Sequence, residues 1–462
     1  MRALILVALV GCTSGNGNGN NGNRPVDSGR TDVDTEVPDV EVTLAAECLP
    51  TLNPLRMACE AVVSDSRALA FRFGSDAEDR IIELPANTVH AFVLSGMTAD
   101  TAFTWTAEAG GASAVGDFRT GIPNGVPDIV VTGEATFDFV LFAHKETLHI
   151  ANTQGELVWY KPLPDEGDGP QGGRMTGTSW LGDGIAFSIS STLYEIGLDG
   201  EFRFESRRGV GHDLPLHHDV FVRDGLRYSV NAQMYTFDGH DFVIDGFYVF
   251  DDDGLYKEWS LGDHLDSDPV WTNNHLGFWS DEWPGAEDFA HANSVSAAED
   301  GTILFSTRYL DRVYGIAGVD SPNFGDVLWT LDGQGGGDFV IGGSPDGLDN
   351  FDGQHHAELH GDTLTLFDNR TGNNARTMSM QLDHVAGTAT VDEVHSLNQS
   401  CNIQGANYIL GNGNVLATCG SDRDIYEFVG GVDEAAIWSL SLEANDQPIP
   451  RGIPIEVRPV GW

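Results

Sequence analysis

Three short histidine-containing segments are the residues of this chain best suited to chemistry. They read His217-His218-Asp219, His291-Ala292-Asn293 and Gln354-His355-His356, and from His218 the steps to His291 and then to His355 are 73 and 64 residues. An imidazole can bind a metal, exchange a proton near neutral pH or attack an electrophile. The segment Phe305-Ser306-Thr307-Arg308 adds a permanent cation. This chemistry requires a fold that brings the four segments together.

Two kinds of site are compatible with these residue types. Three imidazoles suit a divalent metal. They equally suit a tetrahedral oxyanion, with Arg308 and Asn293 donating hydrogen bonds and one neutral imidazole acting as nucleophile. The cation of Arg308 repels a metal ion and favours the oxyanion, so we predict neither a metal nor a cofactor. Asp219 is expected to fix the tautomer of a histidine rather than to bind a metal.

A degenerate repeat must position these residues. One strand type carries an aromatic residue after a turn, in residues 154–159, 199–204, 253–259, 325–329 and 435–438. A four-stranded unit that recurs at about 45 residues is typical of a β-propeller blade. We predict six units, at about 134–165, 173–209, 216–262, 290–333, 354–397 and 402–443.

The phase of the repeat predicts one shared site. The histidine segments stand just before the first strand of the third, fourth and fifth units. Because the first strand of each blade lines the central channel of a propeller, His218, His291 and His355 should converge on one funnel, with Arg308 on the following strand of the fourth unit. The insertion 263–289, which carries Trp271, Trp279 and Trp283, is expected to form a lid or rim loop.

One region before the repeat has the pattern of a small β domain. Residues 42–126 contain short alternating runs, such as 68–73 and 90–94, and resemble a fibronectin type III-like β-sandwich with a scaffold role. The predicted fold is therefore all-β: a six-bladed propeller at 127–462 preceded by this small sandwich.

Net charge limits the partners of the chain. The 462 residues include 70 Asp and Glu against 24 Lys and Arg, a formal charge of −46. Such a surface excludes a nucleic-acid binder that neutralises phosphates and disfavours attachment to anionic lipid through basic patches. It also repels anionic substrates, so Arg308 and the histidines should form a small positive well in an acidic shell.

The N-terminal residues and the cysteines predict a protein outside the cytoplasm. Residues 1–11 resemble a lipoprotein signal peptide with Cys12 as the lipidated residue, and 12–41 is a Gly-, Asn- and Asp-rich tether. The expected location is a bacterial membrane, periplasmic or cell-surface, with the lipid as the only anchor. The other cysteines form two sequence-local pairs, Cys48 with Cys59 and Cys401 with Cys419, which indicates disulfides.

Taken together, the motifs resemble those of the bacterial arylsulfate sulfotransferases. They are H-H-D, then D-x-x-H-A-N-S-V-S (288–296), S-x-R (306–308), G-Q-H (353–355) and F-D-N (367–369), in that order. The resemblance implies a six-bladed propeller enzyme, preceded by a β-sandwich, that works outside the cytoplasm without a nucleotide sulfate donor. Its partners would be a small aryl sulfate donor and a phenolic acceptor.

The resemblance also implies roles for individual residues. His355 would attack the sulfur and become a transient sulfohistidine in a ping-pong cycle, although the adjacent His356 leaves open which of the two faces inward. His218, His291 and Arg308 would bind and stabilise the sulfuryl group, one histidine moving the phenolic proton. Expected substrate contacts are Asn293, His356, Thr418 and Asn369.

Two other functions stay open at this point. A non-catalytic propeller that binds sulfated or acidic glycans would keep the same funnel without a nucleophile. A metal-dependent hydrolase would use His218, His291 and His355 as ligands. A quinone-cofactor dehydrogenase is disfavoured, because the chain has no regular tryptophan docking repeat.

Overall fold

The protein folds almost entirely into β-strands. The computed structural model describes residues 41–76, 78–144, 147–163, 175–189, 191–265, 269–272, 274–432, 435–443, 448–459 and 462. Across these residues the only helix is a short 3-10 turn, Leu261–His264, so the all-β prediction is confirmed. None of the described helical residues forms a segment long and apolar enough to span a membrane. The predicted signal peptide, Cys12 and the tether up to residue 40 lie outside the described residues.

The first sheet contains five strands. They are β1 (Leu44–Pro50), β2 (Met57–Gly74), β3 (Asp79–Leu94), β4 (Ala102–Ala109) and β5 (Ala112–Arg119). Alternate residues of β2 are buried, as expected of a sheet with one solvated face. The first part of β2 pairs with β1 and its last part with β4, so this one long strand serves both ends of the sheet. The strands are hydrogen-bonded in the order β1-β2-β4-β5, with β3 also on β2, and the likeness to a fibronectin type III sandwich stays a prediction.

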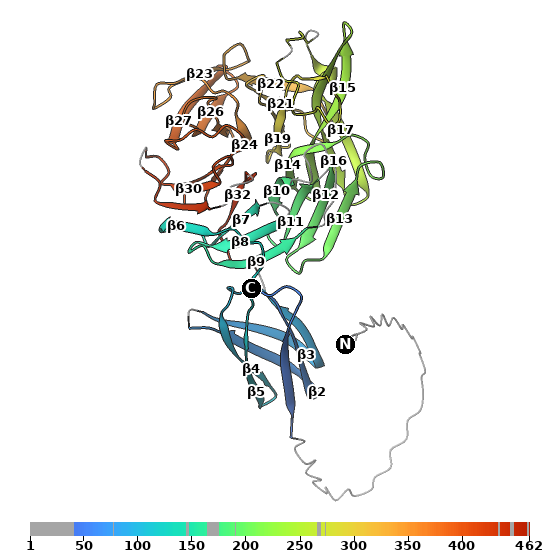
Figure 1. Ribbon diagram of the computed structural model, residues 1–462, viewed down its shortest axis with the longest axis vertical. Helices are drawn as coiled ribbons and strands as arrows, with labels where there is room; N and C mark the ends of the chain where they lie inside the picture. Colours follow the sequence, from blue (N-terminus) through green and yellow to red (C-terminus); the bar gives the residue numbers. More distant parts are fainter. Residues whose placement is uncertain are drawn as a thin grey trace, which may run out of the picture. The chain divides into compact units, whose positions relative to one another are not determined.

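Six more sheets follow within the described residues, each with an antiparallel core of four strands. They consist of β10–β13, β14–β17 with β18, β19–β22, β24–β27 with β23, β28–β31 with β6, and β7–β9 with β32 (Figure 1). Their bounds are β6 (Ile129–Gly133), β7 (Phe139–His144), β8 (Thr147–Asn152), β9 (Leu157–Pro162), β10 (Met175–Trp180), β11 (Gly184–Ile189), β12 (Thr192–Gly197), β13 (Phe202–Arg207), β14 (Leu216–Arg223), β15 (Leu226–Phe237), β16 (His240–Asp251), β17 (Gly254–Ser260), β18 (Glu287–Asp288), β19 (Ala292–Ala297), β20 (Ile303–Thr307), β21 (Arg312–Ile316), β22 (Val327–Asp332), β23 (Val340–Gly342), β24 (His355–His360), β25 (Thr363–Asp368), β26 (Arg376–Asp383), β27 (Thr388–Ser396), β28 (Ala406–Ile409), β29 (Val415–Cys419), β30 (Asp424–Phe428), β31 (Trp438–Leu442) and β32 (Gly452–Ile455).

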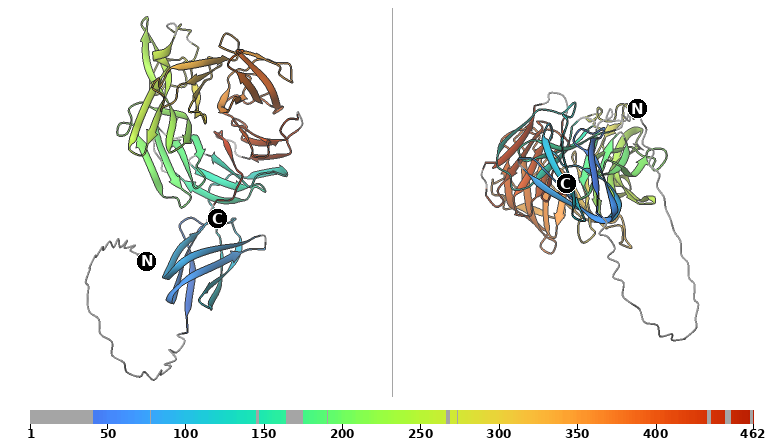
Figure 2. Two further views of the ribbon diagram at one scale, coloured as in Figure 1. Left: turned by 180° about the vertical axis from the view of Figure 1, so that it is seen from behind. Right: turned by 90° about the horizontal axis from the view of Figure 1, so that it is seen from below.

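The six sheets surround a common centre (Figures 1 and 2). Their inner strands contact one another in the order β10, β14, β19, β24, β28 and β32, and β32 contacts β10 again. The central region is therefore bounded by one strand from each sheet. Because β14, β19 and β24 are neighbours in this series, residues at their starts lie close together.

The ring is closed by strands from both ends of the repeat region. The C-terminal strand β32 pairs with β7, and β6, which precedes β7 in the chain, pairs with β31. The predicted unit 134–165 consequently holds only three strands of its sheet, whereas each of the other five predicted units encloses four. The missing inner strand comes from residues 452–455 and cannot be recognised from its own neighbours in sequence.

The repeating aromatic residues bind adjacent sheets together. Trp159 in β9, Trp259 in β17 and Trp438 in β31 each bury the ring and donate the indole N–H to a backbone carbonyl of the next sheet. The acceptor carbonyls belong to the segments that precede the fourth strand of the next sheet. They are those of Leu198, Gly325 and Thr153. Burial of a tryptophan whose N–H is satisfied is favourable, which explains why the repeat places these residues after turns.

Candidate active site

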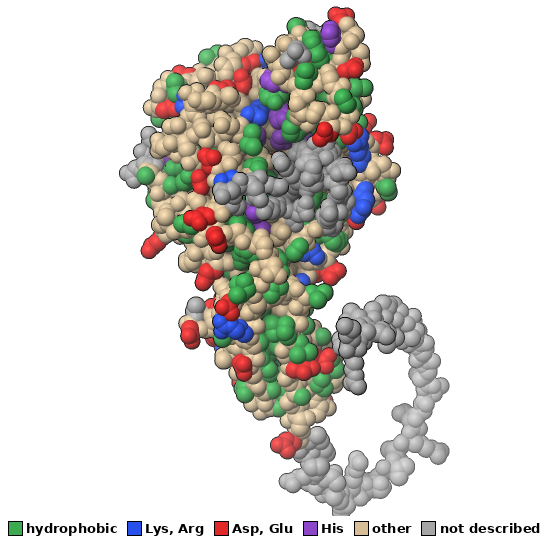
Figure 3. Space-filling model, in the orientation of Figure 1, with side chains coloured by type: hydrophobic (Ala, Val, Ile, Leu, Met, Phe, Trp, Pro, Cys, Tyr) green, Lys and Arg blue, Asp and Glu red, His purple; other side chains and the backbone are tan. Residues whose placement is uncertain are grey.

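Three of the predicted histidines meet at the centre of the ring. The ring centroid of His218 lies 4.7 Å from that of His291 and 6.4 Å from that of His355. On the face drawn in Figure 3, some histidine side chains lie beside basic ones, and acidic side chains are spread over the outer surface. Segments separated by more than 60 residues thus supply one cluster, which we call the histidine cluster (His218, His291 and His355).

The backbone at these positions departs from regular strand geometry. His218 and His291 have positive φ angles of 56° and 49°, and His356 has 51°. Non-glycine residues seldom adopt this left-handed conformation, and it is found preferentially at functional sites. The pairing register also shifts after His217, Ala292 and His355, so β14, β19 and β24 each have a bulge near their start. Bulges redirect side chains, which brings residues from three sheets to one point.

The hydrogen bonds of His355 fix its tautomer. Its Nδ1 lies 2.7 Å from Oδ1 of Asn369 and 3.1 Å from the carbonyl oxygen of Gly353. The amide nitrogen of Asn369 donates to the carbonyls of Cys401 and Gln404, at 2.7 and 2.8 Å, so its oxygen must face His355. Both neighbours of Nδ1 are acceptors, hence Nδ1 carries the hydrogen and Nε2 carries the lone pair.

Burial keeps His355 uncharged. Loss of solvent lowers the pKa of His355 well below its usual value, and the positive charge of Arg308 lowers it further. An imidazole in this state is a nucleophile through Nε2. The assignment differs from the substrate-binding role predicted for Asn369, because both amide hydrogens of Asn369 are used by backbone carbonyls and its oxygen by His355.

His291 is paired with a carboxyl group. Its Nδ1 lies 2.6 Å from Oδ2 of Asp288, and both side chains are buried. Burial lowers the pKa of His291 to about 3 and raises that of Asp288 to about 7. At neutral pH His291 is therefore an uncharged imidazole held in one orientation by Asp288.

His218 is supported by the histidine that precedes it. The Nδ1 atoms of His217 and His218 are 2.7 Å apart, and Nε2 of His217 lies 3.1 Å from Oδ1 of Asp245. Burial lowers the pKa of His218 well below its usual value, with His291 as the next largest cause. Asp219, which we expected to fix a histidine tautomer, instead pairs with Arg451 at 2.7 Å, because the bulge turns it away from the histidines.

Arg308 supplies the cation of the site. It lies one residue beyond the end of β20, and its backbone N–H donates to the carbonyl of His291 at 3.1 Å. Its guanidinium group donates to the carbonyl of Asn402 at 2.6 Å and lies 5.8 Å from the ring centroid of Tyr309. Since burial keeps the three imidazoles neutral, the positive well predicted from the sequence depends on Arg308 rather than on charged histidines.

The other predicted contacts are placed differently. His356 points away from the cluster, with Nε2 3.3 Å from Glu358 and its ring 4.5 Å from that of Tyr408. The hydroxyl of Thr418 accepts a hydrogen bond from the backbone N–H of Gly452 at 2.9 Å, which joins β29 to β32. Both residues therefore stabilise the ring in this structure, rather than contacting the histidine cluster.

Asn293 is buried beside the start of β24. Its amide nitrogen donates to the carbonyl of Gln354 at 2.6 Å, which ties β19 to the residue before His355. Its Oδ1 has no hydrogen-bond partner among the described residues. The bond to the Gln354 carbonyl uses one of the two amide hydrogens, so the donor role expected of Asn293 toward a sulfuryl oxygen stays a prediction.

An aromatic wall borders the histidine cluster and was not predicted. Phe278, in the insertion expected to form a lid, lies 4.5 Å from the His291 ring and 5.2 Å from the His218 ring. Tyr309 stacks on His291 at 4.7 Å. The lid was predicted from the tryptophans of the insertion, of which Trp279 is buried and packs against the ring of His217. The position of Tyr309 directly after Arg308 was the available sequence signal.

The loop 401–404 also escaped prediction. Its carbonyl groups at Cys401 and Gln404 orient Asn369, and the carbonyl of Asn402 orients Arg308. The predicted disulfide between Cys401 and Cys419 is formed and joins this loop to the end of β29. Backbone acceptors carry no signature in residue type, so only the cysteine pair indicated this segment.

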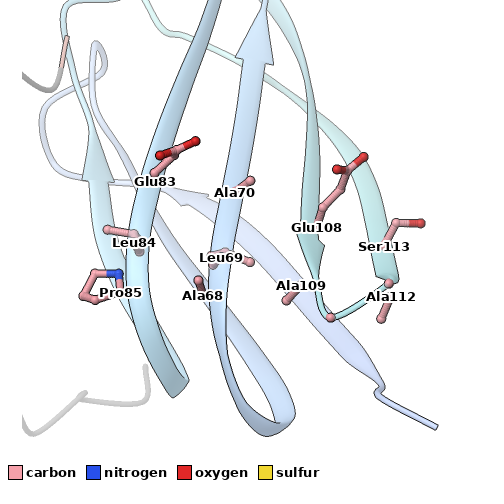
Figure 4. Close-up of a pocket in the computed structure, with 12 residues that line it drawn as sticks. Ala68, Leu69, Ala70, Glu83, Leu84, Pro85, Glu108, Ala109, Ala112 and Ser113 are labelled. Carbon is pink, nitrogen blue, oxygen red and sulfur yellow. The ribbon is translucent and has the colours of Figure 1, made fainter.

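Two further observations concern other sites. Within the described ranges, no three His, Cys, Asp or Glu side chains are grouped in a way that could hold a metal ion. A hollow in the N-terminal sheet is lined by Leu69, Glu83, Leu84, Glu108 and their neighbours (Figure 4). It contains none of the predicted site residues, and its two carboxylates make it unsuited to an anion.

The solved structures that match this chain share little of its sequence. A protein of unknown function from Bacteroides caccae is 13% identical, with 70% of this chain and 100% of that chain covered and a TM-score of 0.42. Virginiamycin B lyase from Staphylococcus aureus is 11% identical, with 68% and 99% covered and a TM-score of 0.35. No match is found among curated proteins.

One protein family matches most of the region that carries the site. The model of the arylsulfotransferase (ASST) family matches residues 190–438, which is more than half of the chain. The matched segment contains the whole histidine cluster, Arg308, Asn369 and the loop 401–404. The chain therefore belongs to the arylsulfotransferase family.

Proposed function

We propose that the protein transfers a sulfuryl group from an aryl sulfate to a phenol by a ping-pong mechanism, with His355 as the nucleophile. The observation that carries this proposal is the orientation of His355. Asn369 and the Gly353 carbonyl occupy its Nδ1, which leaves the Nε2 lone pair beside Arg308, His218 and His291. Membership of the arylsulfotransferase family supports the reaction class.

In the first half-reaction Nε2 of His355 attacks the sulfur of the aryl sulfate. A bond forms between nitrogen and sulfur while the bond between sulfur and the aryl oxygen breaks, and its electron pair leaves with the phenol oxygen. A proton held by the imidazoles of the site passes to that oxygen through one of them, which is left neutral with a free lone pair. The guanidinium of Arg308 stabilises the charge that develops on the sulfuryl oxygens.

In the second half-reaction a second phenol takes up the sulfuryl group. The phenol gives its proton to the same imidazole and its oxygen attacks the sulfur of sulfohistidine 355. The bond between nitrogen and sulfur breaks, and its electron pair returns to Nε2. The enzyme is restored with no net change in its protons, so no cofactor is required for the balance of the reaction.

The surroundings of the cluster suit an aromatic anion. Phe278 and Tyr309 border the imidazoles and can contact the aryl ring of either substrate. The net charge of −46 repels an anion only over the screening distance, about 8 Å at physiological salt, and Arg308 provides local attraction within it. We further propose that the six sheets of the ring are the blades of a propeller spanning 127–462, with 42–126 as a separate small β domain.

Intact-mass measurement of denatured protein tests the reaction. After incubation with 4-nitrophenyl sulfate, the wild type should gain one sulfuryl group and release one equivalent of 4-nitrophenol. His355→Ala should show neither, and His356→Ala should behave as the wild type. An adduct that persists in His355→Ala would overturn the role of His355. Binding of sulfated glycans with no adduct and no released phenol in the wild type would instead support a binding protein.

The location of the protein is a separate proposal. The apolar run of residues 3–10 followed by Cys12 supports a lipid anchor on a bacterial membrane, and the two disulfides fit an oxidising compartment. Metabolic labelling with an alkyne fatty acid should mark the wild type and not Cys12→Ala. Equal labelling of both, or of neither, would contradict the anchor.

A further inference from the structure

A buried ionisable pair behind His218 has no part in the reaction described so far. His217 and Asp245 are both fully buried, each with no exposed surface. Burying a carboxyl group and an imidazole is costly unless each is paired. They belong to the inner strand β14 and to the third strand of the same sheet, β16, so the fold holds them together independently of any substrate.

The pair forms a continuous line to the histidine cluster. Oδ1 of Asp245 lies 3.1 Å from Nε2 of His217, and Nδ1 of His217 lies 2.7 Å from Nδ1 of His218. The second carboxyl oxygen of Asp245 accepts the backbone N–H of Ala292 at 2.7 Å, which fixes the carboxyl group to β19. Trp279 packs its ring against His217 at 5.0 Å and separates the pair from solvent.

The positions of the hydrogens follow from the neighbours. Nε2 of His217 is hydrogen-bonded to the carbonyl of Asn231 at 3.2 Å, a group that can only accept, so this nitrogen carries a hydrogen; Oδ1 of Asp245 lies beside it at 3.1 Å. The short contact between the two Nδ1 atoms needs one hydrogen. When His218 supplies it, both imidazoles are neutral and Nε2 of His218 has a free lone pair.

A second arrangement differs by one proton. If His218 accepts a proton at Nε2, it can pass its Nδ1 hydrogen to His217. His218 is then neutral with a hydrogen on Nε2, and the positive charge rests on His217 beside Asp245. Nε2 of His218 is an acid in this second arrangement, which is the one that must be present when the aryl sulfate reacts, and a base in the first arrangement, which is left after the phenol has taken the proton. In the second arrangement the positive charge lies on His217, farther from Arg308, His291 and His355, which with His217 are the titratable and charged groups around His218.

We propose that His217 and Asp245 form a proton relay that makes His218 the general acid and base of sulfuryl transfer. The inference rests on the proposed function and specifies which imidazole moves the phenolic proton. His218 is the catalytic residue, since it faces the reacting group, while His217 and Asp245 act through it as positioning residues. His291 is less suited, because after burial the charge of Arg308 is the largest cause that lowers its pKa, whereas for His218 Arg308 is the last of five causes.

The dependence of rate on the leaving group tests the relay. A poor leaving phenol requires protonation, whereas an acidic phenol leaves as the anion without it. In His217→Gln and Asp245→Asn, formation of the His355 adduct from 4-methylphenyl sulfate should slow by about 100-fold, the size of a general-acid contribution. The same step with 4-nitrophenyl sulfate should change by less than about threefold.

The controls separate the relay from structural effects. His212→Gln removes another buried histidine, one held by Ser206 and the carbonyl of Ser191, and should leave both donors unaffected. If the rate of adduct formation in His217→Gln and Asp245→Asn fell equally with both aryl sulfates, the pair would have only a structural role. If the rate fell with neither aryl sulfate, the relay would be wrong.

A measurement on the wild type keeps the relay testable if a variant does not fold. Adduct formation in heavy water should be at least about twofold slower with 4-methylphenyl sulfate and nearly unchanged with 4-nitrophenyl sulfate, because only the first needs a proton in flight. An equal isotope effect for both donors would contradict the relay. Absence of any adduct from either donor in the wild type would refute the proposed function itself, which distinguishes the two failures.

Discussion

Two pairs of adjacent histidines occupy equivalent places in the ring, but the second histidine of one pair and the first histidine of the other belong to the histidine cluster. His217-His218 begins β14 and His355-His356 begins β24, and in each the second histidine has a positive φ and the register shifts after the first. In β14 the second histidine faces the cluster and the first supports it. In β24 the first faces the cluster, and the second pairs with Glu358 and Tyr408.

The partners behind each pair account for this difference. Asn369, an uncharged amide, leaves His355 neutral with a fixed tautomer, which suits a nucleophile. Asp245, a carboxyl group, can stabilise positive charge on His217, which suits proton transfer. The bulges also differ: the two unpaired residues of β14 face no residue of β15, whereas the two unpaired residues of β24 lie opposite one residue of β25, Leu366. Identical dipeptides thus acquire different chemistry from the strands behind them.

The largest difference is expected when each histidine of the β24 pair is replaced in turn. His355→Asn should lower kcat by at least about 10³-fold, because the nucleophile is lost. His356→Asn should keep kcat within about threefold and instead lower the thermal midpoint, because Glu358 loses a buried partner. Steady-state kinetics and thermal denaturation check both. Comparable losses of kcat in the two variants would contradict the assignment of separate parts.

Replacing the amide behind His355 tests whether the partner sets the chemistry. Asn369→Ala should lower kcat by about 10- to 100-fold, the usual cost of losing the group that orients a functional histidine. Asn369→Asp should place behind His355 the kind of partner that Asp245 provides behind His217. A carboxylate raises the pKa of His355, so the loss in Asn369→Asp should grow as the pH falls. A pH-independent loss in this variant would show that Asn369 acts only by packing.

The two disulfides offer a matched pair of smaller changes. Substituting Cys401 and Cys419 by serine should lower kcat by about tenfold, because the loop that orients Asn369 and Arg308 is released. Substituting Cys48 and Cys59, which lie directly opposite each other in β1 and β2, should leave kcat unchanged. Both double variants should lose stability, by about 3 kcal/mol on the chain-entropy estimate. Unchanged kcat in the first variant would remove the loop from the site.

The smallest expected effect concerns pH. Burial and Arg308 lower the pKa of His355, so its nucleophilic neutral form persists where an ordinary imidazole is protonated. Adduct formation at pH 5.5 should therefore stay within about twofold of its rate at pH 7.5. A tenfold fall would match an unperturbed histidine of pKa about 6.5 and contradict the buried, uncharged nucleophile.

Stability must be controlled in that measurement. The lowered pKa values of His291 and His149, each about 3, mean that the unfolded chain binds protons below pH 6.5 that the folded protein does not bind. Folding stability from these groups is complete above pH 6.5 and declines as the pH falls toward 3. The raised pKa of Asp288, about 7, acts in the opposite direction. Circular dichroism at pH 5.5 should therefore accompany the kinetics.

The sequence predicted those features that depend on local pattern. Turns followed by aromatic residues indicated the sheets, and the tryptophans of the repeat do join neighbouring sheets through Trp159, Trp259 and Trp438. The histidine phase predicted that His218, His291 and His355 would meet. These signals succeed because strand alternation and turn chemistry are properties of short segments.

The supporting residues could not be predicted in the same way. Asp219 was given a role from its place next to His218, but a bulge directs it to Arg451, whereas Asp245 is distant in sequence and adjacent in the sheet. The acceptors for Asn369 are backbone carbonyls, which every residue has. Positions set by pairing between distant segments have no signature in residue type.

The closure of the ring by β32 has a consequence for when the site comes into existence. Arg451 precedes β32 and neutralises Asp219, the residue after His218, so this carboxylate gains its partner only when residues 451–455 have been synthesised. Until then β7 lacks its neighbour, and the strand that carries His218 borders an uncompensated buried charge. The surroundings of His218 are therefore complete only once the last strand has joined the ring, and a chain that ended before Arg451 would carry all three histidines of the cluster without the charged partner of Asp219.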